Sequence, residues 1–265
     1  MDGSDPHMLK ALLDWQAELG ADEPIGDTPV DCYALPDKLG KPDMPTPEVK
    51  SASAPAVVHA DKPDAGRFIG AARAAAEGAA DLAALKAAVE AFEGCELKRG
   101  AKTTVFADGN PAAQVMVIGE APGRDEDAAG LPFVGAAGRL LDKMFAAIGM
   151  ARDGEAADNS LYITNVLPWR PPQNRTPTPE EIAMLKPFLE RHVALADPDI
   201  LVIMGNVACS AILGRTGVTR LRGKWDQAMD RPALPMFHPA YLLRTPAAKR
   251  EAWADLLSLQ SRVRG

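Results

Sequence analysis

Short apolar runs alternate with amphipathic segments over the last two thirds of the chain. The apolar runs are typical of strands buried on both faces, and the segments between and after them have helical spacing. This alternation predicts an α/β fold, a three-layer α/β/α sandwich around a central, mainly parallel four-stranded sheet. The expected strands cover residues 115–119, 161–165, 200–205 and 234–238, and the expected helices cover residues 135–148, 179–196, 206–214 and 247–260.

The first quarter of the chain has a different pattern. Residues 8–19 have apolar positions at helical spacing and predict a short helix. Residues 20–66 are rich in Pro, Asp, Ala and Ser and have no sustained apolar period, which is typical of a linker. We therefore expect an N-terminal arm over residues 1–66, with residues 1–7 resembling an expression-tag remnant, and one globular domain over residues 67–265.

An alanine-rich segment, residues 68–93, opens the expected domain. Leu82, Leu85, Val89 and Phe92 lie at helical spacing within it. The segment is therefore expected to form a helix that packs on the rest of the domain.

Composition limits the class of protein. The chain has 265 residues, of which 47% are hydrophobic, enough to bury a full core. It has no run of about 20 apolar residues such as a membrane helix needs, so a soluble, cytoplasmic protein without a membrane partner is expected. We also expect a monomer. Cys32, Cys95 and Cys209 lie far apart and form no CxxC pair, which predicts free thiols and no zinc knuckle.

The net charge of −7 is unevenly distributed. Residues 1–94 contain 8 Lys and Arg against 17 Asp and Glu, whereas residues 95–265 contain 21 against 19, so the two parts carry −9 and +2. A domain near neutrality can bind a phosphate backbone through a local basic face. The composition therefore permits DNA binding without demonstrating it.

Polar side chains follow each of the four expected strands. Glu120 comes directly after the first strand, Asn165 ends the second, Asn206 follows the third and His238 ends the fourth. Ligands of open parallel sheets bind outside the carboxyl ends of the strands. A carboxamide there can read an amide-like edge, and an imidazole can stabilise charge on oxygen.

Each of these residues also has a structural interpretation. The acidic run around Glu120 could be a solvated turn, Asn165 could cap the next turn, and His238 could be a satisfied polar residue at a strand end. Phe133 could be ordinary core. Their convergence on one edge of the sheet favours a ligand site.

Three segments carry a resemblance to a known family. They are GEAPGRDEDAAGLPFVGAAGRLLD (119–142), YITNVLPWRPPQNRTPTPEE (162–181) and FHPAYLLR (237–244). In order and spacing they resemble the family 4 uracil-DNA glycosylases, from about Leu82 to the C-terminus. The resemblance implies a DNA repair enzyme that flips uracil out of DNA and hydrolyses its N-glycosidic bond, leaving an abasic site.

The resemblance also implies roles for individual residues. Glu120 matches an acid that orients water, and His238 matches an imidazole that meets uracil O2. Phe133 matches an aromatic that stacks on the base, Asn165 an amide that reads its Watson–Crick edge, and Glu126 a carboxylate that crowds C5 and rejects thymine. The rest of the pocket loop is Gly119, Ala121, Pro122 and Gly123.

The last motif resembles an element that enters the duplex, and which of its side chains is the wedge stays open. Its residues are Tyr241, Leu242, Leu243 and Arg244. Arg170, Arg175 and Arg222 are further candidates for phosphate contacts, although surface ion pairs would explain them equally well.

One departure from the family is large. The family binds an iron–sulfur cluster through four cysteines, and the matching places here hold Phe92, Cys95, Trp169 and Leu185. A cluster needs about four thiolates, so no cofactor and no metal are expected. We expect these side chains to form an apolar plug that joins the N-terminal helix, the RPP loop and the helix over residues 179–196.

Two other functions remain open from the sequence. A uracil-DNA or single-strand-binding protein of the same fold could have lost turnover or could trap its product covalently. A nucleotide-binding α/β protein is a weaker alternative, because GEAPG matches neither GxGxxG nor GxxxxGK[ST].

Overall fold

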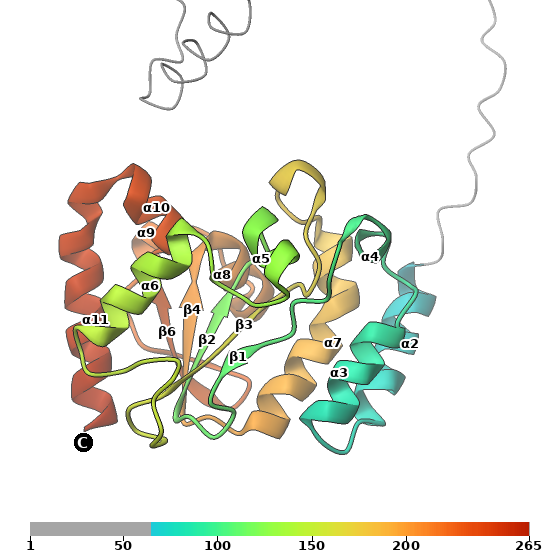
Figure 1. Ribbon diagram of the computed structural model, residues 1–265, viewed down its shortest axis with the longest axis horizontal. Coiled ribbons are helices and arrows are strands. Elements are labelled where there is room, and N and C mark those ends of the chain that lie inside the picture. Colours follow the sequence, from blue (N-terminus) through green and yellow to red (C-terminus); the bar gives the residue numbers. More distant parts are fainter. Residues whose placement is uncertain (1–64, 265) are drawn as a thin grey trace, which may run out of the picture. The chain divides into compact units, whose positions relative to one another are not determined.

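The computed structural model describes residues 65–264 (Figure 1). The expected helix over residues 8–19, the remnant over residues 1–7, most of the linker and Cys32 lie outside the described residues. Within residues 65–264, no helix combines the length and the apolarity that crossing a bilayer requires.

The central sheet confirms the predicted α/β sandwich but has more strands than expected. Four strands are parallel: β2 (Val115–Gly119), β3 (Leu161–Asn165), β4 (Ile200–Met204) and β6 (Arg231–Met236). The short strands β1 (Asp108–Gly109) and β5 (Asp226–Ala228) add antiparallel edges, giving the order β1-β3-β2-β4-β6-β5. The sheet thus has six strands rather than the expected four, because the two edge strands are too short to carry an apolar run.

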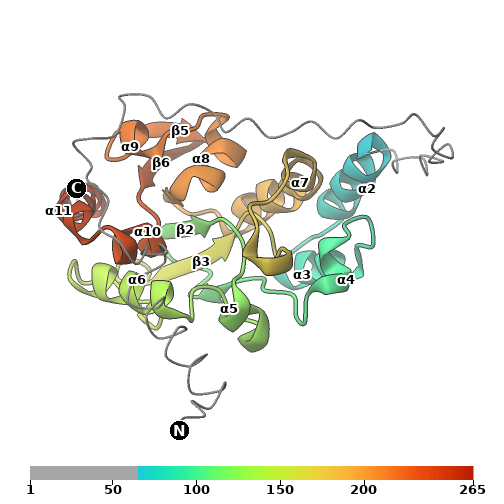
Figure 2. The same cartoon turned by 90° about the horizontal axis from the view of Figure 1, so that it is seen from above.

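Helices cover both faces of this sheet (Figure 2). Val115 and Val117 of β2 belong to the core beneath α6 (Ala136–Ala146) and α11 (Lys249–Val263). Met116 and Ile118 belong to the opposite core, beneath α7 (Pro179–Ala196) and α8 (Gly205–Leu213). Successive side chains of β2 thus point to opposite faces of the sheet, so helices pack on both faces and form the outer two of three layers.

The alanine-rich segment forms two helices instead of the single helix expected. They are α2 (Ala65–Glu77) and α3 (Leu82–Ala91), and both pack on α7. The Asp81 carboxylate accepts a hydrogen bond from the Ala84 N–H at 2.8 Å and caps the start of α3. Gly78 and this cap explain the break.

Six short helical segments complete the described chain. They are α4 (Leu97–Gly100), α5 (Arg124–Ala129), η1 (Pro172–Asn174), α9 (Val218–Leu221), α10 (Pro239–Arg244) and η2 (Pro246–Ala248). Helix α5 follows β2 and α10 follows β6 at the carboxyl ends of those strands. The fourth strand ends at Met236 instead of the expected residue 238, so His238 is the N-cap of α10.

A buried cluster joins the outer helices to the loop that follows β3. Phe92, Cys95, Trp169 and Leu185 all belong to one core and are each at most 8% exposed. The Phe92 ring meets the Phe188 ring edge-on at 5.4 Å. We call Phe92, Cys95, Trp169, Leu185 and Phe188 the apolar plug; it links α3, the loop after β3 and α7, as expected.

The plug should contribute measurably to stability. Leu185→Ala should lower the free energy of unfolding by about 2–5 kcal/mol, because Leu185 is 1% exposed and truncation leaves a cavity. Urea denaturation followed by circular dichroism measures the change. Leu257→Ala, at a site 44% exposed, is the control and should change stability by less than about 0.5 kcal/mol. Equal effects from the two variants would contradict a packed plug.

Candidate active site

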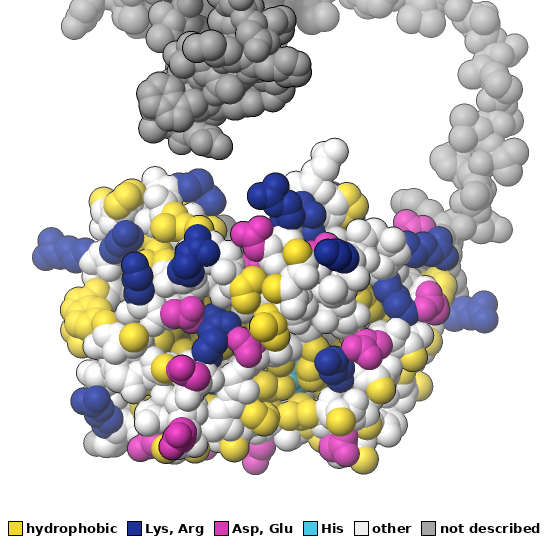
Figure 3. Space-filling model, in the orientation of Figure 1, with side chains coloured by type: hydrophobic (Ala, Val, Ile, Leu, Met, Phe, Trp, Pro, Cys, Tyr) yellow, Lys and Arg dark blue, Asp and Glu magenta, His cyan; other side chains and the backbone are white. Residues whose placement is uncertain are grey.

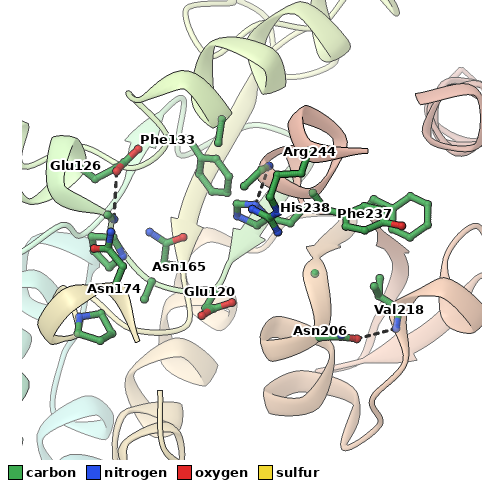
Figure 4. Close-up of a pocket in the computed structure, with 18 of the residues that line it drawn as sticks. Glu120, Glu126, Phe133, Asn165, Asn174, Asn206, Val218, Phe237, His238 and Arg244 are labelled. Carbon is green, nitrogen blue, oxygen red and sulfur yellow. Dashed lines mark hydrogen bonds between the residues drawn. The ribbon is translucent and has the colours of Figure 1, made fainter. Parts of the chain in front are cut away.

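One cavity of about 610 Å³ opens at the carboxyl ends of the parallel strands (Figure 4). It contains the residues that the strand-end argument placed together, Glu120, Asn165 and His238, together with Phe133. It is also lined by Ala121, Pro122, Gly123, Glu126, Ala137, Pro171, Asn174, Arg175, Gly205, Asn206, Val218, Thr219, Phe237, Ala240, Tyr241 and Arg244.

Gly119 lies beneath the cavity and does not line it. A Cβ atom at this position would come within 2.4 Å of Asn165 Oδ1 and 2.6 Å of Phe133 Cζ. Only glycine therefore lets the end of β2 approach these two side chains so closely. Gly119 sets the spacing between the floor of the pocket and the groups above it.

Glu120 projects into the cavity (Figure 4). Its carboxylate makes no hydrogen bond or ion pair with other residues of the 65–264 segment. Burial raises the pKa of Glu120 above its ordinary value, because the charged form loses hydration. A carboxylate without a protein partner in a cavity is suited to bind water or stabilise a nearby cation.

Asn165 ends β3 and is 7% exposed. Its amide also makes no hydrogen bond within the described chain. A buried amide that lines a cavity presents both a donor and an acceptor to a ligand. This geometry disfavours the alternative that Asn165 only caps the following turn.

Phe133 is 5% exposed and has a φ of 53°, in the left-handed region that non-glycine residues rarely adopt. Its ring stacks on the His238 ring with 5.4 Å between centroids and 27° between planes. Phe133 lines the cavity on a backbone conformation that is strained for a non-glycine residue.

Glu126 has a structural role that the sequence did not reveal. Its carboxylate accepts hydrogen bonds from the N–H groups of Gly123 at 3.1 Å, Val134 at 3.1 Å and Gly135 at 3.0 Å. One side chain thus ties the GEAPG loop to the loop that carries Phe133. Glu126 still lines the cavity, as expected for a residue near the ligand.

His238 is held as a neutral donor. Its Nδ1 accepts a hydrogen bond from the Ala240 N–H at 3.2 Å, so the proton of the neutral ring lies on Nε2. Burial and the positive charge of Arg244 lower the pKa of His238 to about 4. At neutral pH the ring can therefore donate one N–H while carrying no charge.

The expected duplex-entering motif divides between pocket, core and surface. Tyr241 and Arg244 line the cavity, whereas Leu243 is 44% exposed. Leu242 is fully buried with Phe237 and Ala248, which corrects the expectation that it contacts DNA. A side chain in this core cannot enter a duplex without unpacking α10.

The three other arginines occupy different places. Arg175 lines the cavity and pairs with Glu181. Arg170 lines a neighbouring hollow of about 330 Å³, beside Arg124. Arg222 does not reach the cavity, because its Nε donates to buried Asp255 at 2.8 Å. The phosphate contact expected of Arg222 stays a prediction, and its guanidinium is paired with Asp255.

Asn206, the polar residue expected after the third strand, also lines the cavity. Asn206 Oδ1 accepts hydrogen bonds from the N–H groups of Gly217 at 3.1 Å and Val218 at 2.7 Å, which brings α9 to the cavity wall. Asn206 is the second residue after β4. Asn174, Thr219 and Phe237 carry no comparable signal in the sequence.

Comparisons with known proteins agree with the fold. Residues 106–257 match the model of the uracil DNA glycosylase superfamily, and the chain belongs to this family. A Type-4 uracil-DNA glycosylase of Archaeoglobus fulgidus is 38% identical over 172 residues, 61% of this chain and 82% of that protein. A Type-4 uracil-DNA glycosylase of Thermotoga maritima is 38% identical over 153 residues, 57% of this chain and 77% of that protein.

A more distant relative is a Type-5 uracil-DNA glycosylase of Pyrobaculum aerophilum. It is 28% identical over 162 residues, covering 56% of this chain and 71% of that protein.

The apolar plug does not fit the iron–sulfur cluster that the family resemblance implies. Its one thiol, Cys95, is 3% exposed, and burial raises its pKa to about 11, so the thiol stays protonated at neutral pH. Trp169 donates its indole N–H to the Thr104 hydroxyl at 3.0 Å, and Leu185 offers no ligand atom. Three of the four places thus contain packed side chains without a thiolate.

We predict that the purified protein contains no stoichiometric iron. Metal analysis of protein prepared without oxygen, with a visible spectrum, provides the measurement. About four irons per chain or a broad band near 400 nm would contradict the prediction. Cys95→Ser is the matched variant and should leave the iron content and the spectrum unchanged.

Proposed function

We propose that this protein removes uracil from DNA by hydrolysing the N-glycosidic bond and leaves an abasic site. The observation that carries the proposal is the convergence of Glu120, Phe133, Asn165 and His238 on one cavity at the carboxyl ends of parallel strands. The relatives named as uracil-DNA glycosylases support the same chemistry.

Substrate binding begins with extrusion of the base, because a base inside a duplex cannot reach a buried pocket. Phe133 stacks on the flipped uracil, and Asn165 reads its amide-like edge. Leu243, on the surface of α10, is our candidate for the wedge that fills the vacated stack. Lys and Arg side chains gather on the side of the molecule that carries α10, over this helix and near η1 (Figure 3).

Bond cleavage places negative charge on the N1 and O2 side of uracil and positive charge on the deoxyribose. The neutral His238 donates its Nε2–H to O2, and this hydrogen bond strengthens as the charge develops. Glu120 stabilises the sugar cation and orients the water that adds to it. The products are free uracil and an abasic site.

Glu126 contributes to base selection in this proposal. Its carboxylate, fixed by three backbone N–H groups, crowds the position that the thymine methyl would occupy. One methyl group is worth about 1–3 kcal/mol of discrimination. We further propose, as expected from the sequence, that the protein acts as a monomer in the cytoplasm.

The direct test is a gel assay on an oligonucleotide with a single uracil. Alkali should cut the product at the abasic site, and an oligonucleotide with thymine at the same position should stay intact. A band that migrates as a stable protein–DNA adduct would instead support a covalently trapping protein. Binding without any cleavage would support a protein that has lost turnover.

His238→Ala should slow single-turnover excision by about 10²–10³-fold, because it removes a donor that acts mainly in the transition state. Binding to uracil-containing DNA should persist through Phe133 and Asn165. His238→Gln should recover part of the rate through a neutral N–H donor. Excision by a folded His238→Ala variant at the wild-type rate would refute the assignment.

Asn165→Asp should lower the rate of uracil excision, because a carboxylate cannot donate to uracil O4. The same variant should gain activity on cytosine, whose exocyclic amine donates. Parallel single-turnover assays on uracil and cytosine oligonucleotides measure the change. Unchanged activity on uracil would remove Asn165 from base recognition.

The excision rate should fall on the acid side of neutrality as Glu120 protonates. Burial raises the pKa of Glu120, so this loss occurs at higher pH than for an exposed carboxyl group. His238, with a pKa of about 4, stays neutral over most of that range. Glu120→Gln should excise uracil more slowly than the wild type, and its rate should not fall on the acid side of neutrality. If its rate falls at low pH as in the wild type, Glu120 does not have this role.

A further inference from the structure

Arg152 lies behind the loop that carries Phe133 and does not line the cavity. Its guanidinium uses all five of its N–H groups. Nε and Nη2 donate to Asp142 Oδ1 at 3.0 and 2.8 Å, and Nη1 donates to Asp108 Oδ2 at 2.6 Å. The other two N–H groups bind the carbonyl oxygens of Pro132 at 3.1 Å and Phe133 at 2.9 Å.

The backbone of the loop over residues 132–134 is held by hydrogen bonds to charged side chains. These residues make no backbone–backbone hydrogen bond within the described chain. Arg152 binds two of the loop carbonyl groups, and Glu126 binds the N–H groups of Val134 and Gly135. The loop is therefore held from both sides by charged groups, which form stronger hydrogen bonds than neutral ones.

The Phe133 backbone also packs tightly against α6. A Cβ atom at Gly138 would lie 1.7 Å from the Phe133 carbonyl oxygen. The carbonyl is thus confined between Gly138 and Arg152, while the φ of 53° is unfavourable for phenylalanine. A strained conformation of this kind persists only when its surroundings fix it.

We propose that Arg152, fixed by Asp108 and Asp142, is a positioning residue that holds the Phe133 ring in its base-stacking orientation. The inference rests on the proposed function, since the stacking partner is the flipped uracil. It also gives β1 a role, because Asp108 of this edge strand anchors the guanidinium. Lysine could not reproduce the arrangement, since its ammonium has three donors and no planar fork.

The test is a double-mutant cycle between Arg152→Gln and Phe133→Ala. In the wild-type background, Arg152→Gln should raise the DNA concentration for half-maximal single-turnover excision about tenfold, with a smaller effect on the saturated rate. In the Phe133→Ala background, the same change should alter that concentration less than twofold, because the ring is already absent. Equal effects in both backgrounds would overturn the proposal.

Arg191→Gln is the matched control. Arg191 donates from Nε and Nη2 to the Ala79 carbonyl at 3.1 and 2.7 Å, so it also holds a backbone carbonyl, but beside α2 and away from the cavity. Its loss should leave excision unchanged, and a decrease as large as that of Arg152→Gln would show a general effect of instability. If Arg152→Gln does not fold, Asp142→Asn weakens the same guanidinium and enters the same cycle.

A readout without catalysis separates this proposal from the proposed function. In protein labelled with 4-fluorophenylalanine, the ¹⁹F resonance of Phe133 is assigned by its loss in Phe133→Leu. Arg152→Gln should shift or broaden that resonance, and Arg191→Gln should not. If Arg152→Gln shifts the ¹⁹F resonance but the wild-type protein excises no uracil, the positioning role stands and the proposed glycosylase function is refuted. An unchanged resonance would overturn the positioning role whatever the activity.

Discussion

The parallel alignment of β2, β3, β4 and β6 is the constraint on which the site depends. Because these strands run in one direction, their carboxyl ends meet at one edge, and the residues that follow them converge there. Glu120, Asn165 and His238 are far apart in the sequence but share a cavity for this reason. The loops after the strands add the aromatic wall and the clamp provided by Glu126.

The apolar plug stands where the family resemblance implies an iron–sulfur cluster. Three elements that thiolates would bridge are joined here by Phe92, Trp169 and Leu185, all nearly inaccessible to solvent. Burial of large side chains contributes roughly 1.5–3 kcal/mol each, without directional bonds. The plug touches the loop after β3, so it can fix the position of that loop without taking part in the chemistry.

The sequence predicted the parts of the structure that depend on local patterns. Apolar runs located the four parallel strands, and motif order placed Phe133 and His238 at the pocket. The edge strands β1 and β5 escaped prediction because two or three residues carry no period. The break between α2 and α3 had a signal in Gly78 and Asp81, which the alanine-rich spacing obscured.

Contacts between distant residues could not be predicted in the same way. The pairing of Arg222 with Asp255, 33 residues away, had no signal in the sequence. The neighbours Leu242 and Leu243 differ only in which side of α10 they occupy. Arg152 gave no signal, since its partners Asp108 and Asp142 come from separate elements.

We propose that the uracil-excising site stands on an apolar plug without a metal cluster. The most direct measurement is multiple-turnover release of free uracil, with iron determined in the same sample. We expect many uracils to be released per chain by protein that contains no iron, and no change in this release after treatment with a chelator. Activity that rises in proportion to iron content, or an iron-free protein that releases no uracil, would contradict it.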